Sequence, residues 1–128
     1  MGLRRFISSR STVQNNTPID LDEDEVYRIL SAPRRRHVIS ILSERDEDAI
    51  PLKELARVIA TTETGIGETD EDVYNAVYTS LYQAHLPKLD DTGVIDWDTE
   101  EGTVRRGHSI PGLVAIIYAV LEGAQASD

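Results

Sequence analysis

Apolar residues recur three or four positions apart along most of the chain after residue 20. This is the spacing of one face of an α-helix, and it predicts helices over residues 21–31, 33–45, 51–62 and about 69–91. The residues expected to face the core from the first three helices are Val26, Ile29, Leu30, Val38, Ile41, Leu42, Leu52, Leu55, Ala56 and Ile59.

Capping and helix-breaking residues predict where these helices begin and end. Asp20, followed three residues later by Glu23, is close to a capping box. Pro33 suits the first turn of the second helix, because a backbone N–H is not needed there. Thr69, together with Asp72, is expected to cap the fourth helix, which Gly93 should end in a left-handed turn.

After Gly93 the pattern changes from helical to strand-like. The stretches "VIDW" (94–97) and "VRRGHS" (104–109) predict two strands joined by a turn, and Ile50 is expected to lie in a short strand. Residues 110–123 predict a last helix. The order α-α-α-α-β-β-α gives a fold that is mainly α with a small β-wing (α+β).

The stretch "QAHLPKLDDTGVI", residues 83–95, resembles the end of the recognition helix of ArsR-type regulators. Their pattern runs Ser-x-His-Leu-x-x-Leu-x-x-x-Gly-Leu-Val. The residues here that fall on it in register are His85, Leu86, Leu89, Gly93, Val94 and Ile95. Residues 29–44 and 51–60 resemble the second and third helices of the same class. More narrowly, residues 20–123 look like an uncharacterised family of small haloarchaeal winged-helix proteins marked by "HLPKL".

The resemblance implies a winged helix-turn-helix protein that binds double-stranded DNA and regulates transcription. The fourth helix would enter the major groove, and wing arginines would hold the DNA backbone. Pro87 lies inside this helix and is expected to kink it. Asp70, Glu71 and Asp72 at its start would repel phosphate. A second function therefore stays open, in which the wide apolar face of the fourth helix binds protein partners without DNA.

Small polar residues and arginines are the candidates for DNA contact. The set is Tyr78, Thr79, Ser80, Gln83, Arg105, Arg106, Arg34 and Arg35. Gln83 can pair with adenine through two hydrogen bonds. Because the faces of a strand alternate and Val104 is expected to face inward, Arg105 should point outward, toward phosphate. Arg106 should cross to the body of the protein and pair with a carboxylate. The alternative is that both arginines lie on a solvated strand face.

Arg34, Arg35 and Arg36 stand together at the start of the second helix, where the helix dipole disfavours cations. They are therefore expected to meet anions. We expect carboxylates of this protein to be those anions, and phosphates of DNA are the alternative.

Tyr74, Tyr78 and Tyr82 follow one another at four-residue spacing on the fourth helix. Tyr82 is expected to lie in the core. For Tyr74 and Tyr78 two interpretations stay open: packing in the core or in a dimer, and direct contact with bases or phosphates.

The last helix is apolar nearly all round, which predicts a partner for it. We expect a homodimer through the terminal helices, as in ArsR-type proteins. The interface residues would be Leu113, Ile116, Ile117, Val120 and Leu121. A two-fold dimer would place two recognition helices about one DNA turn apart.

The charge of the chain indicates the solvent in which the protein works more than it indicates the binding partner. The net charge is −10, with 23 acidic residues against 13 basic ones, of which only Lys53 and Lys88 are lysines. Such a bias resembles the proteins of salt-accumulating halophiles, especially haloarchaea. At molar salt the Debye length is about 3 Å, so repulsion between an acidic surface and DNA is largely screened. An ordinary acidic protein is the alternative.

The positions of the charged residues along the chain predict the domain boundaries. Residues 1–19 carry Arg4, Arg5 and Arg10 without an acidic residue, which predicts a flexible basic arm. Residues 20–123 form the predicted winged-helix domain, and residues 124–128 a polar tail.

Several functions are excluded or disfavoured. The absence of cysteine excludes disulfides and thiolate chemistry. His37, His85 and His108 lie on different predicted elements, so neither a metal nor a cofactor is expected, and His85 is expected to pack or cap. No catalytic motif appears, which indicates a protein that is not an enzyme. No apolar run approaches the ~20 residues of a membrane span, and without an export signal we expect a cytoplasmic location.

Overall fold

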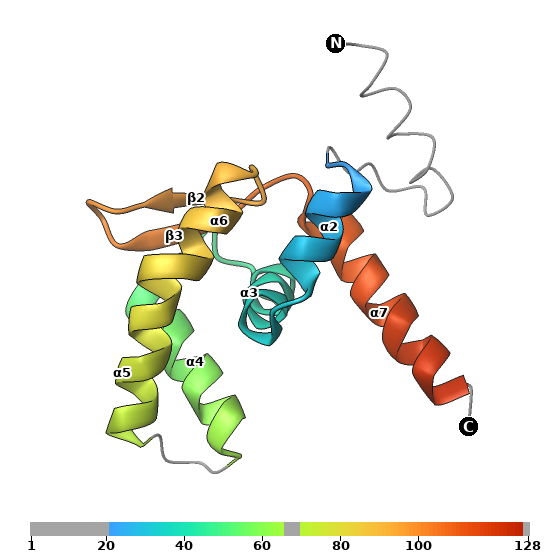
Figure 1. Cartoon of the computed structure of the whole chain (residues 1–128). Coiled ribbons are helices and arrows are strands. Elements are labelled where there is room, and N and C mark those ends of the chain that lie inside the picture. Colours follow the sequence, from blue (N-terminus) through green and yellow to red (C-terminus); the bar gives the residue numbers. More distant parts are fainter. Residues whose placement is uncertain (1–20, 66–69, 127–128) are drawn as a thin grey trace.

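The computed structural model describes residues 21–65 and 70–126, with side chains as far as Val120. It is mainly helical, with a small sheet, as the sequence predicts (Figure 1). The elements are α2 (Glu23–Leu30), α3 (Pro33–Glu44), β1 (Ala49–Pro51), α4 (Leu52–Thr64), α5 (Glu71–Ser80), the π-helical turn η2 (Leu81–His85), α6 (Leu86–Asp91), β2 (Ile95–Asp98), β3 (Thr103–Arg106) and α7 (Ile110–Ala126).

The sheet has three antiparallel strands in the order β1-β3-β2. Val104 on the central strand pairs with Ile50 on one side and with Trp97 on the other. The expected strand at Ile50 is therefore confirmed, and it ties the hairpin to the start of α4. The hairpin of β2 and β3 extends from the helices as the wing of a winged helix-turn-helix fold (Figure 1).

Helix α3 occupies the middle of the domain, where α2, α4, α7 and β3 pack around it (Figure 1). Of its expected inward residues, Val38 and Leu42 are buried and Ile41 is half-buried. Ile39 is buried as well, because neighbours cover α3 on more than one side. The expected inward residues of α4 are all buried.

The N-caps of two helices differ from those predicted. The Asp22 carboxylate, not that of Asp20, caps α2 by accepting from the Glu25 N–H at 2.8 Å. Asp70 caps α5 by accepting from the N–H groups of residues 72 and 73, at 2.7 and 3.4 Å. Asp20 and Thr69, the predicted caps, lie outside the described residues.

Residues 71–91 form one continuous helix whose middle is a π turn. Pro87 has no N–H to donate to the carbonyl of Gln83, so the ordinary helical bond is lost there. The Leu86 N–H bonds instead to the Leu81 carbonyl, five residues back. The irregularity expected from Pro87 thus lies in the turn before it. Gly93, with φ of 79°, ends the helix as predicted.

Helix α7 packs against α3 at its start and then extends away from the domain (Figure 1). Leu113 and Ile117 are buried in the core of their own domain, which corrects the prediction that they form an exposed dimer interface. Ile116 is half-buried, and Val120 is 65% exposed. The side chain of Leu121 lies outside the description. The helix continues to Ala126, into the segment predicted as a tail.

Within the described residues, no helix is both long enough and apolar enough to cross a membrane.

Candidate nucleic-acid interface

The outward face of α5 and η2 carries a stripe of uncharged hydrogen-bonding side chains. Asn75, Thr79 and Gln83 follow at four-residue spacing, and all three are exposed. Within the described residues none of these side chains has a hydrogen-bonding partner. We call them the polar stripe. Thr79 and Gln83 were predicted as candidates, whereas Asn75 was missed, although its spacing to Thr79 could have identified it.

The polar stripe lies in the longest charge-free part of this helix. Residues 73–87 contain no Asp, Glu, Lys or Arg, in a chain of which 28% is charged. At the start of α5, the Asp70 carboxylate is turned to the helix N–H groups, and Glu71 lies 3.7 Å from Arg57. Only the Asp72 carboxylate has no such partner among the described residues. Much of the acidic helix start is therefore compensated locally.

A row of aromatic rings runs beside the polar stripe. Tyr74 and Tyr78 have ring centroids 6.0 Å apart, Tyr78 and Tyr82 stack at 6.4 Å, and Tyr82 meets Trp97 of β2 edge-on at 5.8 Å. The Arg57 guanidinium lies 3.9 Å above the Tyr74 ring. We call Tyr74, Tyr78, Tyr82 and Trp97 the aromatic row.

The burial of these rings decides between the earlier interpretations. Tyr74 and Tyr78 are half-buried against the core, which supports packing for both. Tyr82 is 46% exposed, so the prediction that it lies in the core is wrong. The π turn and the wing explain the difference, because Tyr82 lies in η2 and packs against Trp97. Trp97 had no place among the sequence candidates.

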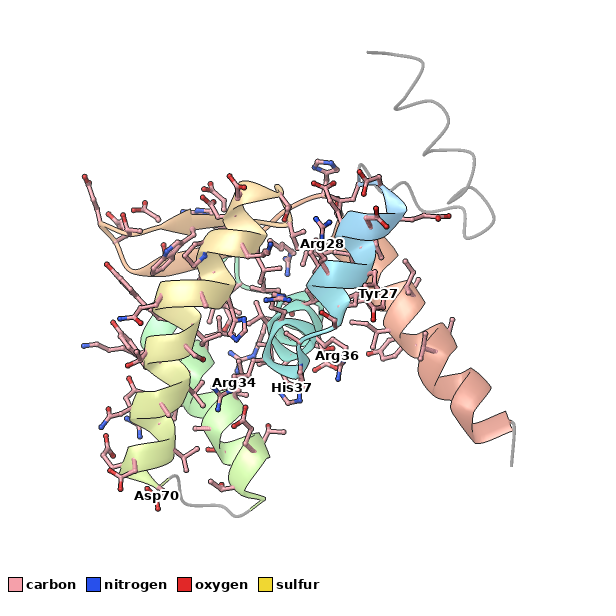
Figure 2. All side chains as sticks on the ribbon, in the orientation of Figure 1. Tyr27, Arg28, Arg34, Arg36, His37 and Asp70 are labelled. Atoms are coloured by element: carbon pink, nitrogen blue, oxygen red, sulfur yellow. The ribbon has the colours of Figure 1, made fainter. Side chains whose placement is uncertain are left out.

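Arg34 and Ser80, both DNA-contact candidates, bind each other. Arg34 donates from Nη1 to Ser80 Oγ at 2.9 Å, and its Nε and Nη2 donate to the two Glu63 oxygens at 2.7 and 2.9 Å. Arg34 thus reaches from α3 to α4 and α5, and Figure 2 shows it on that side of α3. The hydrogen bonds to Glu63 raise the pKa of Arg34 and lower that of Glu63. The expected carboxylate partner is confirmed for this arginine.

Arg35 and Arg36 have a different kind of partner. Arg35 donates to the carbonyls of Ile29 and Arg28 at 3.0 and 2.6 Å, and Arg36 donates to the carbonyl of Leu30. These carbonyls end α2, where the helix dipole favours cations. For these two arginines the prediction of carboxylate partners is wrong, and backbone oxygens provide the negative charge.

The wing arginines divide as the strand alternation predicts. Val104 is fully buried, and Arg105 is exposed on the outer face of the sheet, opposite Asp96. Arg105 has no ion pair within the described residues. Arg106 crosses to the body but donates to the carbonyls of Leu42 and Arg45 at 2.7 and 2.6 Å, not to a carboxylate. Arg106 is therefore committed to the end of α3.

Residues 27–105, from α2 to β3, match the model of a domain family described as a domain of unknown function, DUF7344. The chain belongs to the DUF7344 family. The search of curated proteins and the search of solved structures both returned no match. In this DUF7344 chain the matched residues include the polar stripe, the aromatic row and Arg105.

The described surface of the DUF7344 chain offers few free cations. Within the described residues, those without an ion pair or a hydrogen-bonding partner for the side chain are Arg28, Lys53, Lys88 and Arg105. The tip of the wing is acidic, with exposed Asp98, Glu100 and Glu101. Few side chains of the described surface are thus free to bind an anion.

The histidines of the DUF7344 chain lie on different parts of the fold: His37 in α3, His85 in η2 and His108 after β3. Among the described residues, no group of three His, Cys, Asp or Glu side chains is placed to hold a metal ion. His85 is half-buried beside Arg35, which confirms that it packs. Burial lowers its pKa, and the charges of Arg35 and Arg34 lower it further.

Proposed function

We propose that this DUF7344 protein binds double-stranded DNA as a transcriptional regulator, with α5 and η2 in the major groove. The observation that carries the proposal is the polar stripe, three exposed and unpartnered side chains on one helix face. Eight residues of helix span about 12 Å at ~1.5 Å per residue. This length matches three to four base pairs at about 3.4 Å each.

The chemistry of the stripe suits base edges. The amides of Asn75 and Gln83 can each donate to and accept from adenine, and Thr79 can contact the methyl group of thymine. Such contacts need no charge, in keeping with the charge-free helix. Lys88 of α6 and Arg105 of the wing have no side-chain partner among the described residues, and they would contact phosphates.

The other DNA-contact candidates bond the helices and the wing to one another. Arg34 and Ser80 fix α5 to α3, Arg35 ties η2 to the end of α2, and Arg106 holds the wing to α3. We therefore assign Arg34, Arg35, Ser80 and Arg106 a positioning role in place of DNA contact. Half-buried Tyr78 likewise packs and does not read bases.

A homodimer belongs to this proposal. Tyr118 and Val120 on α7 are 45% and 65% exposed, and Tyr27 on α2 is 75% exposed. Figure 2 shows Tyr27 on the side of α2 that faces α7. Large exposed apolar residues on the two terminal helices favour burial against a second copy. Two copies would give DNA two half-sites about one turn apart.

The acidic composition fits a protein of the haloarchaeal cytoplasm. A relation to ArsR-type regulators is part of the same proposal. Molar salt screens exposed carboxylates over about 3 Å. The carboxylates at the wing tip then repel DNA phosphates only when the two are in direct contact.

A protein-interaction module without DNA binding is the second candidate. The observations that favour it are the carboxylates at the wing tip and the exposed ring of Tyr82. Selection from genomic DNA fragments at molar potassium chloride separates the two functions. Enrichment of a common sequence supports DNA binding. Recovery of fragments in their starting proportions would favour the module.

A further inference from the structure

The exposed end of the aromatic row has the chemistry of an arginine-binding surface. Tyr78 and Tyr82 stack with an angle of 12° between their planes, and the Trp97 ring stands at 89° to Tyr82. A guanidinium binds over the face of such rings, and over Tyr and Trp more strongly than over Phe. Arg57 already binds Tyr74 in this way, at 3.9 Å. Among the described residues, no cation occupies Tyr78, Tyr82 or Trp97.

One carboxylate contacts the strand at this end of the row. The Asp90 carboxylate accepts from the backbone N–H of Trp97 at 3.0 Å, which holds it next to the backbone of this residue. Asp96 and Asp98, the neighbours of Trp97 along β2, are exposed and point to the opposite face of the sheet. None of the three has an ion pair within the described residues. A flat cation therefore fits here better than an anion or an uncharged group.

Most arginines of the folded domain already have partners. Arg34 and Arg45 are in ion pairs, and Arg35, Arg36 and Arg106 are bonded to backbone carbonyls. Of the two without one among the described residues, Arg28 lies on α2 and Arg105 points to the face of the sheet opposite to Trp97. We propose that Tyr82 and Trp97, with Asp90 beside them, bind arginine side chains from residues 1–19 of the same chain.

The composition and length of this segment carry the choice of occupant. Residues 1–19 hold Arg4, Arg5 and Arg10 and no acidic residue, so their charge is +3 and the remaining 109 residues carry −13. From Leu21 back to Arg10 is 11 residues, which reach about 36 Å when extended. A domain of about 100 residues has a radius of gyration of only ~13 Å. In Figure 1 the start of α2 and the wing both lie at the upper end of the domain, on opposite sides of α6.

Binding in this way would bring cations to the DNA-facing helix. Tyr82 lies next to Gln83 of the polar stripe, so an arginine on Tyr82 stands at the edge of the proposed groove contact. The inference does not depend on DNA binding, because the contact is made within the protein.

The single tryptophan of the chain provides the test, with no DNA present. Acrylamide quenching of Trp97 fluorescence is compared at fixed potassium chloride between the full chain and a variant with Arg4→Ala, Arg5→Ala and Arg10→Ala. Quenching should increase in this variant. The matching lysine variant keeps the charge but stacks less well, so its quenching should be intermediate. Arg28→Ala, at an exposed arginine of α2, serves as the control and should leave quenching unchanged.

Equal quenching in the full chain and the triple alanine variant would overturn the inference. If protection of Trp97 from acrylamide increases with protein concentration, residues 1–19 of a second copy bind there. That result would overturn the proposal that the contact lies within one chain. Protection that requires added DNA would assign the row to nucleic acid. Tyr82→Ala tests the aromatic row itself. This substitution should abolish the difference in Trp97 quenching between the full chain and the triple alanine variant.

Discussion

Nη1 of Arg35 lies 3.2 Å from Nδ1 of His85 and joins the start of α3 to the π turn η2 that follows α5. Because an arginine only donates, His85 must accept at Nδ1 and carry its proton on Nε2. A second proton on His85 would remove this bond and place two cations together. The contact therefore requires a neutral histidine.

The first prediction is a loss of stability at mildly acidic pH. Burial and the neighbouring arginines lower the pKa of His85 in the folded protein. Below the unfolded value of about 6.5, the unfolded chain binds a proton that the folded one does not. The free energy of unfolding should therefore fall as pH drops below that value and level off below the folded pKa. Guanidinium unfolding at several pH values measures it.

His85→Gln should reduce this pH dependence, whereas His108→Gln, at an exposed position after β3, should retain it. An unchanged slope in His85→Gln would show that another group causes the effect.

The second prediction concerns Arg34, which connects three helices. Arg34→Ala should lower the free energy of unfolding by about 1 kcal/mol, a figure discounted because the pair with Glu63 is partly exposed and screened by salt. Arg34→Lys should recover little of this stability, because lysine cannot form the bidentate contact with Glu63. Denaturant midpoints measure both, and Arg28→Ala is the control, expected within about 0.5 kcal/mol of the parent. Equal midpoints for Arg34→Ala and Arg28→Ala would contradict the bracing role.

Local rules explain which parts of the structure were predictable. The left-handed Gly93, the buried Val104 and the outward Arg105 all follow from the chemistry of neighbouring residues, and all are confirmed. Arg106 was placed correctly, but its partners lie 61 and 64 residues away, at the end of a helix whose position no local pattern gives.

The candidate site was less predictable for a related reason. The exposure of Tyr82 depends on a π turn and on Trp97 of another element, two features that do not appear in helical periodicity. Ser80 reads as a free polar residue in the sequence, yet Arg34 from a different helix binds it. Contacts between distant elements determined these outcomes.

The third prediction separates the dimer surface from the core. Val120→Glu should yield a folded monomer, because Val120 is 65% exposed and its loss removes only the proposed contact with a second copy. Ile117→Glu should destabilise the domain by roughly 3 kcal/mol or more, because Ile117 is 9% exposed and a buried charge is costly. Light scattering and circular dichroism distinguish the two results. A monomeric parent protein at high salt would rule out the dimer.

The fourth prediction concerns salt. With 23 acidic residues and a net charge of −10, exposed carboxylates repel one another in dilute buffer, and salt screens them. The melting temperature should rise from dilute buffer to molar potassium chloride. A flat or falling curve would contradict adaptation to high salt.

The central claim, that the polar stripe reads DNA bases, is tested most directly by affinity for a selected sequence and for scrambled DNA at fixed molar potassium chloride. Gln83→Ala should weaken binding to the selected sequence by about 1–3 kcal/mol and change the preferred base at one position. Arg105→Ala should weaken binding to both DNAs alike, because a phosphate contact carries no base identity. Thr62→Ala, an exposed position of α4, should change neither. If Gln83→Ala and Arg105→Ala both bind as the parent does, α5 does not lie in the groove and the protein-interaction module is the better account.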